Sequence, residues 1–225
     1  MISNSYLICR TIYYNIRMFE TIILILLIMF IIIYKLKYKS PIIAIEAFNN
    51  QSYLVNDLPD SLDAANLLAK IMLTMSTLVN NIIDDYKNEK IFKSKRDRKF
   101  IKYINIIQQR LPSVKISENP TDSQYTSYSV NKGEELVFCI REKKRFKLHN
   151  INELLYVAIH EIAHIGCPQI GHTDLFQRIN IYLLEKAVCY KLYKYIDYSE
   201  TNKDYCGMTL TSTILGSSIK CNVIV

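Results

Sequence analysis

Cysteine is sparse and scattered in this sequence of 225 residues, and no two cysteines form a Cys-x-x-Cys pair. The spacing gives no dense disulfide framework, so we expect free thiols in a reducing compartment. Cys167, which lies beside the histidine motif described next, is expected to be a small buried residue and not a ligand or a redox switch. The six cysteines are Cys9, Cys139, Cys167, Cys189, Cys206 and Cys221.

Histidine is scarcer still, with four in the chain, yet residues 160–164 read His-Glu-Ile-Ala-His. With so few histidines, His-Glu-x-x-His arises by chance in well under about one in a hundred sequences of this composition. Asn150, with Glu153 three residues on, is typical of a helix N-cap, and Gly166 followed by Pro168 is typical of a helix stop. The sequence therefore predicts that the motif lies on a helix.

On a helix, His160 and His164 lie one turn apart on the same face, so both imidazoles can reach one ion. Glu161 lies about 100° round the helix, where it misses that ion but reaches a water bound to it. Zinc hydrolases are arranged in this way, with a metal that lowers the pKa of the water and a carboxylate that takes its proton. The alternative is an ordinary core helix with two satisfied histidines. We favour metal binding.

A catalytic zinc needs a third protein ligand. His172 is favoured, because the glycines and proline of residues 166–171 predict a short loop that turns the chain back beside the helix. Glu185 is the alternative, since another branch of zinc peptidases places a ligating carboxylate at that distance. The metzincin pattern is not met, because Cys167 and Ile170 stand where it requires Gly and His.

The histidine motif, followed by Gly171-His172-x-Asp-x-Phe176, resembles the active-site segment of the WLM group of metallopeptidases and, more distantly, of SprT-like proteases. It is most similar to the uncharacterised WLM-like members found in large DNA viruses. The resemblance is strongest over residues 154–187 and covers less than half of the chain.

This resemblance implies a zincin-like fold and a metal site within residues 150–190. Characterised relatives are associated with cleaving proteins crosslinked to DNA, but the tail and recognition motifs that target them are not evident here. The residues implied are His160, His164 and His172 as ligands of a single Zn²⁺, and Glu161 as general acid and base.

Residues 18–36 form a long apolar stretch near the N-terminus, uninterrupted over residues 21–34. With Glu20 and Lys35 extending outward, it reaches the roughly 20 residues that a bilayer requires. No small-x-small cleavage site follows it, which favours a membrane anchor over a cleaved signal peptide. A buried helix of a soluble protein would have a polar face, which this stretch lacks.

We therefore expect a membrane anchor in residues 1–40, which contacts lipid through residues 18–36, and a zincin-like metallopeptidase domain in residues 41–225. Three lysines follow the span within residues 35–39 and two arginines precede it. This small charge difference slightly favours a cytoplasmic catalytic domain at a host or virion membrane.

The rest of the chain predicts an α+β domain in which the metal helix lies beside a small sheet. A cap at Asp60 or Ser61 begins one helix, a second covers residues 97–110, and residues 173–174 cap a third. The first of these helices has apolar residues at spacings of three and four: Leu62, Leu68, Ile71, Met72, Met75, Leu78, Val79 and Ile82.

Two β-prone runs, at residues 126–130 and 135–141, are joined by Asn-Lys-Gly at residues 131–133, which is typical of a hairpin. By analogy with zincins, we expect this hairpin to present an edge strand to the substrate backbone. Tyr195, Tyr198 and Tyr205 are candidates to polarise a substrate carbonyl, and the sequence leaves the choice open. We expect Met208 to pack in the core and His149 not to be a ligand.

A basic run, Lys87–Lys102, carries eight basic residues against two acidic ones. A solvated surface is the favoured interpretation. The alternative is a site for nucleic acid or anionic lipid.

The resulting hypothesis is a membrane-anchored zinc-dependent metallopeptidase acting on a protein or peptide substrate. Two alternatives are a non-catalytic membrane or virion scaffold with a structural metal, and a protease acting on nucleic-acid-bound proteins. Asn50-Gln51-Ser52 is a glycosylation acceptor, and its modification would show that the domain faces the lumen instead of the cytoplasm.

Overall fold

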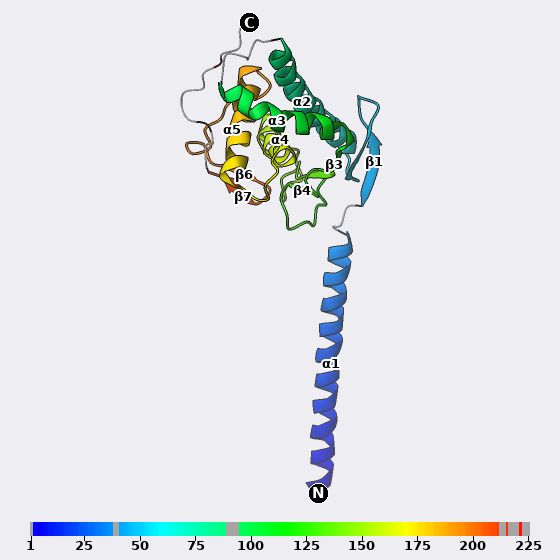
Figure 1. Cartoon of the computed structure of the whole chain (residues 1–225). Coiled ribbons are helices and arrows are strands. Elements are labelled where there is room, and N and C mark those ends of the chain that lie inside the picture. The colour runs from blue at the N-terminus through cyan, green and yellow to red at the C-terminus, as the bar shows by residue number, and fades with distance from the viewer. Residues whose placement is uncertain (1, 38–40, 89–94, 212–214, 216–220, 222–225) are drawn as a thin grey trace. The chain divides into compact units, whose positions relative to one another are not determined.

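The protein is described here by a computed structural model that covers residues 2–37, 41–88, 95–211, 215 and 221 (Figure 1). The chain divides into two compact units, Met1–Ser40 and Pro41–Val225. Each unit is described by itself.

The first unit consists of one helix, α1 (Ile2–Lys37). Its segment Ile16–Tyr34 has a mean hydropathy of 2.7 and no buried residues, so it is long and apolar enough to be a membrane anchor or a signal sequence. One helix of the second unit, α2 (Ser61–Lys87), also meets this criterion of length and composition. However, 44% of the 18-residue apolar window of that helix is buried, as is usual for a core helix.

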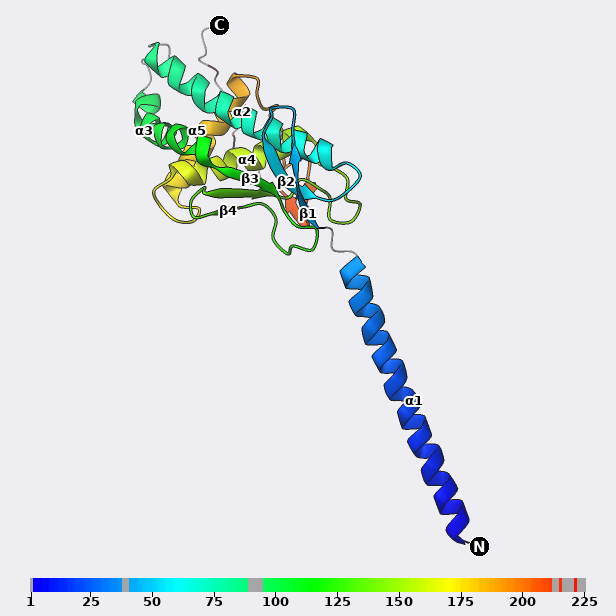
Figure 2. The same ribbon diagram turned by 90° about the vertical axis from the view of Figure 1, so that its right-hand side faces the viewer.

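A five-stranded mixed sheet forms one side of the second unit, with the strand order β1-β2-β3-β5-β4. The central strands β2, β3 and β5 are parallel, and each edge strand is antiparallel to its neighbour. Figure 2 shows β1, β2 and β3 side by side, with α2 packed across them. The strands are β1 (Ile42–Glu46), β2 (Ser52–Asn56), β3 (Lys115–Glu118), β4 (Tyr128–Val130) and β5 (Glu135–Phe138).

The helix that carries the histidine motif, α4 (Ile151–Gly166), lies at the centre of the unit. It packs against three other helices and also contacts β4, so its core face is buried on several sides (Figure 1). The chain also has a short hairpin of β6 (Lys203–Tyr205) and β7 (Met208–Leu210). The remaining helices are α3 (Lys95–Arg110), the 3₁₀ turn η1 (Leu111–Ser113) and α5 (Asp174–Cys189). The unit is therefore of the expected α+β class.

α4 ends at Gly166, where the sequence predicted a stop, and the C-cap residue is Cys167 in an extended conformation. Close packing is a separate reason for a glycine at this position. A Cβ on Gly166 would lie 2.9 Å from the side chain of Ile107 and 3.0 Å from the carbonyl oxygen of Tyr103. The glycine is required because α3 and α4 approach each other closely at this point.

Most of the expected secondary structure is present, with shifted limits. The hairpin forms, but its strands are shorter than predicted, and Arg141 lies in an isolated bridge with Leu148 beyond β5. Leu62, expected on the apolar face of α2, is 55% exposed. In the basic run, residues 89–94 lie outside the described part of the chain.

The expectation of free thiols is wrong for four cysteines. Cys139 is bonded to Cys206, and Cys189 is bonded to Cys221. Partners separated by 67 and 32 residues leave no local spacing signal, so the sequence could not reveal the pairs. Cys167 is free and buried, as expected.

Candidate functional site

Residues 160–164 lie in the last two turns of α4, whose start is fixed by Asn150. The Asn150 side chain accepts a hydrogen bond from the backbone N–H of Asn152 at 2.8 Å, as an N-cap does. Glu153 does not complete a capping box, because its carboxylate pairs with His149 and Lys203. The helix therefore presents His160 and His164 on one face.

The loop after α4 brings His172 back to this face. Its Nε2 lies 3.0 Å from His160 Nε2, which in turn lies 3.3 Å from His164 Nε2. The potential ligand atoms of the three histidines all lie within 4.8 Å of one another. Glu185, the alternative third ligand, instead pairs with Arg96 at 2.6 Å. The structure thus brings together the three predicted histidines and places Glu185 elsewhere.

The loop that carries His172 is attached at several points. Lys132, in the β4–β5 turn, donates a hydrogen bond from Nζ to the carbonyl oxygen of Pro168 at 2.7 Å. Thr173 caps α5, accepting from the backbone N–H of Phe176, and its hydroxyl donates to Gln169 Oε1 at 2.6 Å. These contacts fix the loop between two secondary-structure elements.

Phe176 of α5 forms the floor under the histidines. It is fully buried, and its ring centroid lies 4.0, 4.9 and 5.0 Å from those of His164, His160 and His172. One aromatic side chain thus contacts all three imidazoles and limits their rotation.

His160 and His164 are held in their neutral form. Burial, together with the neighbouring His164 and His172, lowers the pKa of His160 to about 3. Burial and the neighbouring His172 lower the pKa of His164 to about 4. A neutral imidazole keeps a nitrogen lone pair available, which is the form that binds metals.

Glu161 lies next to this cluster and has no ionic partner. It is 6% exposed, and burial raises the pKa of its carboxyl group to about 7. No group in the described part of the chain forms a hydrogen bond or ion pair with its carboxylate. A buried and unpaired carboxylate is costly, and such groups concentrate at functional sites.

A cavity of about 610 Å³ opens beside Glu161 and the three histidines. One wall is the segment 126–129, which contains the start of the edge strand β4. Another is the β6–β7 hairpin, which contributes Tyr205, Met208 and Leu210. The edge strand expected beside the site is therefore present. Met208, expected in the core, is 48% exposed and lines the cavity.

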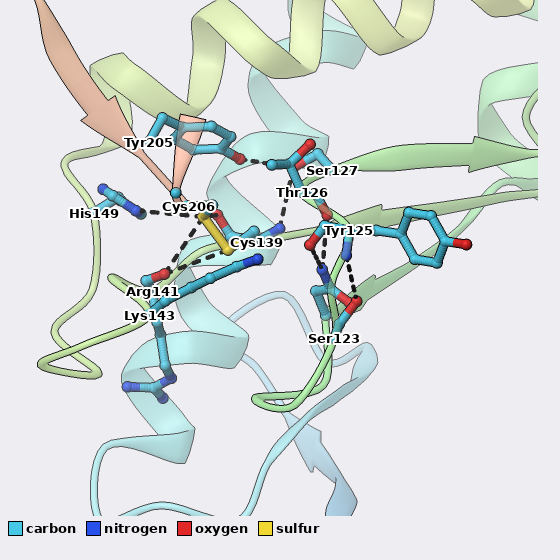
Figure 3. Close-up of a disulfide and its surroundings, with 12 residues drawn as sticks. Ser123, Tyr125, Thr126, Ser127, Cys139, Arg141, Lys143, His149, Tyr205 and Cys206 are labelled. Carbon is cyan, nitrogen blue, oxygen red and sulfur yellow. Dashed lines mark hydrogen bonds between the residues drawn. A yellow bond between two sulfur atoms is a disulfide. The ribbon is translucent and has the colours of Figure 1, made fainter. Parts of the chain in front are cut away.

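Of the three candidate tyrosines, Tyr205 lines the cavity. Its hydroxyl is hydrogen-bonded to that of Ser127 at 2.6 Å, and Ser127 Oγ accepts from the backbone N–H of Cys139 at 3.1 Å (Figure 3). The disulfide between Cys139 and Cys206 holds the same two segments together. The hairpin wall is therefore attached to the sheet next to the segment 126–129.

The other two tyrosines lie outside the lining of the cavity. Tyr198 is fully buried beside Tyr156, and Tyr195 donates to the carbonyl oxygen of Leu215 at 3.2 Å. Tyr156 itself lines the cavity and was missed in the sequence. It precedes His160 by one helical turn, and that spacing was the available signal.

Together, the fold and the site define an α+β protein with a three-histidine cluster and a buried carboxylate in one cavity. No model of a known protein family and no solved structure matches the chain. It is 37% identical over 166 residues to uncharacterized protein R325 of Acanthamoeba polyphaga mimivirus, an alignment that covers 74% of this chain and 80% of that protein. The chain therefore belongs to the same family of large-DNA-virus proteins as R325.

Two relatives come from iridoviruses. Uncharacterized protein 136R of Invertebrate iridescent virus 6 is 33% identical over 116 residues, which cover 48% of this chain and 59% of the relative. Uncharacterized protein 042R of Invertebrate iridescent virus 3 is 35% identical over 82 residues, which cover 36% and 50%.

Proposed function

We propose that this protein is a zinc-dependent metallopeptidase of the zincin-like type, similar to the WLM group, and that α1 anchors it to a membrane. The observation that carries the proposal is the buried carboxylate of Glu161, unpaired among the described residues, beside three converging imidazoles. That the substrate is a peptide rests on the resemblance of residues 154–187 to WLM peptidases.

The three histidines fit zinc. Ligand nitrogens at Zn–N distances of 2.0–2.1 Å in a tetrahedral site lie about 3.3 Å from one another. The Nε2 atoms of His172 and His164 lie 3.0 and 3.3 Å from that of His160, close to this value. Nitrogen lone pairs that converge at such distances repel each other unless a proton or a cation lies between them. When bound, zinc supplies Lewis-acid polarisation of an oxygen and lowers the pKa of a water molecule.

The protein's own groups have distinct roles in this proposal. His160, His164 and His172 would hold the cation where it faces the cavity that they line. Glu161 takes a proton from the attacking water and delivers it to the amine nitrogen that leaves. Water has access to Glu161 because the cavity is open beside it, whereas the opposite side of α4 is packed.

The substrate backbone binds along β4 in this proposal. β4 is an edge strand, so its outer N–H and C=O groups are available to an extended peptide. Residues 126–129 line the cavity, which places a peptide paired with this segment next to Glu161.

The scaffold alternative requires a different donor set. Structural zinc is usually closed by four protein ligands, whereas the potential metal-binding group among the described residues has three. Glu161 would then have no role to offset the cost of its burial. The nucleic-acid alternative has no comparable support, and one basic residue of the run, Arg96, is paired with Glu185 of α5.

The test is hydrolysis of an unfolded protein by the full-length chain in detergent. We expect activity that a chelator abolishes and that stoichiometric zinc restores. Absence of activity in a zinc-loaded, folded preparation would overturn the proposal.

A further inference from the structure

The pairing of the cysteines in the second unit indicates the compartment in which this unit folds. In the described part of this unit, four cysteines form two disulfides, and Cys167 is free. Disulfides persist in oxidising compartments and are rare where glutathione and thioredoxin keep thiols reduced. Two pairs in one domain therefore indicate a non-cytoplasmic environment.

The Cys139–Cys206 bond has the position of a structural disulfide. The two residues are 7% and 3% exposed, and they join the end of the sheet to the β6–β7 hairpin (Figure 3). Cys206 Sγ also lies 3.6 Å from His149 Nε2, in a region closed to solvent. A bond buried in this way forms while the hairpin docks. The oxidant must then be present in the compartment where the domain folds.

The single acceptor for N-linked glycans in the sequence, Asn50-Gln51-Ser52, is open to an enzyme. It lies at the β1–β2 turn, and all three residues are exposed. Asn49 and Gln51 bind the hydroxyl of Tyr53 and stabilise the turn, and the backbone N–H of Asn50 donates to the carbonyl oxygen of Ala47 at 3.0 Å. The side-chain amide of Asn50 makes no hydrogen bond with the described residues. The acceptor is therefore both accessible and unengaged.

A second Asn-x-Thr triplet in the sequence is neither a chemically competent acceptor nor accessible. Asn119-Pro120-Thr121 has proline in the middle position, which blocks glycosylation. Asn119 is also buried, and its amide donates to the carbonyl oxygens of Tyr125 and Thr126. Asn50 is thus the one acceptor that both chemistry and exposure allow.

We propose that the unit Pro41–Val225 folds on the oxidising, non-cytoplasmic side of its membrane and carries an N-linked oligosaccharide on Asn50. This orientation is the opposite of the one that the flanking charges favoured. That preference came from three lysines against two arginines, a difference of one charge. Two disulfides and an exposed acceptor are stronger evidence for the orientation than a difference of one charge. The inference rests on the proposed membrane anchor and does not depend on the proposed peptidase activity.

Disulfide formation and glycosylation each need one co-reactant. In each disulfide, two thiols lose two electrons and two protons to the disulfide of an oxidoreductase, which becomes a dithiol. In glycosylation, Asn50 Nδ2 forms a bond to the anomeric carbon of a lipid-linked oligosaccharyl diphosphate. The bond from that carbon to the diphosphate breaks, and the amide proton leaves with the lipid diphosphate.

The test is expression of the full-length chain in cultured eukaryotic cells, followed by endoglycosidase treatment and gel mobility. Asn50→Gln and Ser52→Ala remove the acceptor in two ways, and Asn49→Gln is a matched control that leaves it intact. Tyr6→Thr adds an acceptor at Asn4, on the other side of the segment Ile16–Tyr34. Thiols are alkylated in intact cells before lysis, and mass spectrometry follows Cys139 and Cys206.

We expect an endoglycosidase-sensitive shift in the wild type and in Asn49→Gln, its loss in Asn50→Gln and Ser52→Ala, and no added glycan in Tyr6→Thr. Cys139 and Cys206 should react with the alkylating agent only after reduction. A glycan that depends on Tyr6→Thr, no glycan in any variant, or free thiols at Cys139 and Cys206 would each overturn the proposal.

Discussion

Phe176 stacks on His164 with ring centroids 4.0 Å apart and an interplanar angle of 21°. The same ring contacts His160 and His172, so a single side chain of α5 supports imidazoles from α4 and from the loop between the helices. The geometry of the cluster thus depends on the packing of α5 against α4.

Phe176→Leu should weaken zinc binding more than it weakens the fold. The smaller side chain costs about 1–2 kcal/mol in the free energy of unfolding and frees the imidazoles to rotate. We expect about a tenfold loss of zinc affinity, similar to the loss of an outer-shell partner. The control is Phe100→Leu, which removes a buried ring stacked on Tyr182 and away from the cluster. Equal zinc affinities in the two variants would argue against a role for Phe176 in positioning the histidines.

His172→Ala and Glu185→Ala should separate the two possible third ligands. His172 Nε2 lies 3.0 Å from His160 Nε2, whereas Glu185 is paired with Arg96 on the surface of α5 and α3. Zinc affinity should fall by more than about a hundredfold in His172→Ala, beyond what an outer-shell loss costs. It should be unchanged in Glu185→Ala. Zinc titration with a competing chelator gives the answer, and the reverse pattern would assign the site to Glu185.

Gly166→Ala should destabilise the domain by about 1–3 kcal/mol, because the added Cβ overpacks the α3–α4 contact. Two of its three close contacts would be with Ile107. The same substitution should therefore cost less in an Ile107→Ala background, although the contact with the carbonyl oxygen of Tyr103 remains. Urea denaturation of the four proteins measures the cycle, and additive effects would contradict the close approach.

Loss of the Cys139–Cys206 bond should have a large effect on stability. A bond that closes a loop of 67 residues lowers the conformational entropy of the unfolded chain and so raises its free energy by about 4 kcal/mol. We expect the double variant Cys139→Ala/Cys206→Ala to lose about that free energy of unfolding and to release the hairpin that carries Tyr205. The measurement is denaturation under non-reducing conditions, beside Cys167→Ala as a control at a free buried thiol. A double variant as stable as the control would show that the bond is absent or without effect.

The sequence was most informative where the relevant interactions are local. The helix from Asn150, the Thr173 cap and the turn at residues 131–133 depend on neighbours within four residues, and all three are present. The position of His172 was also predictable, because a short loop after α4 has few ways to return. These local features account for the histidine cluster.

Contacts between distant segments were not predictable. Tyr205 and Met208 reach the cavity because a hairpin at the end of the chain docks beside Ser127, 78 residues earlier than Tyr205. The pairing of Cys139 with Cys206 depends on the same docking. Periodicity indicates which face of an element is apolar, but it does not indicate which remote segment covers that face.

The central claim is that Glu161 acts on water at a zinc held by His160, His164 and His172. The most direct measurement is zinc content and peptide hydrolysis, taken on the same preparations of wild type and Glu161→Gln. We predict one zinc per chain in both proteins and a rate at least about a hundredfold lower in the variant, because a general base is lost while the ligands remain. Equal hydrolysis rates in the two zinc-loaded proteins would contradict the account.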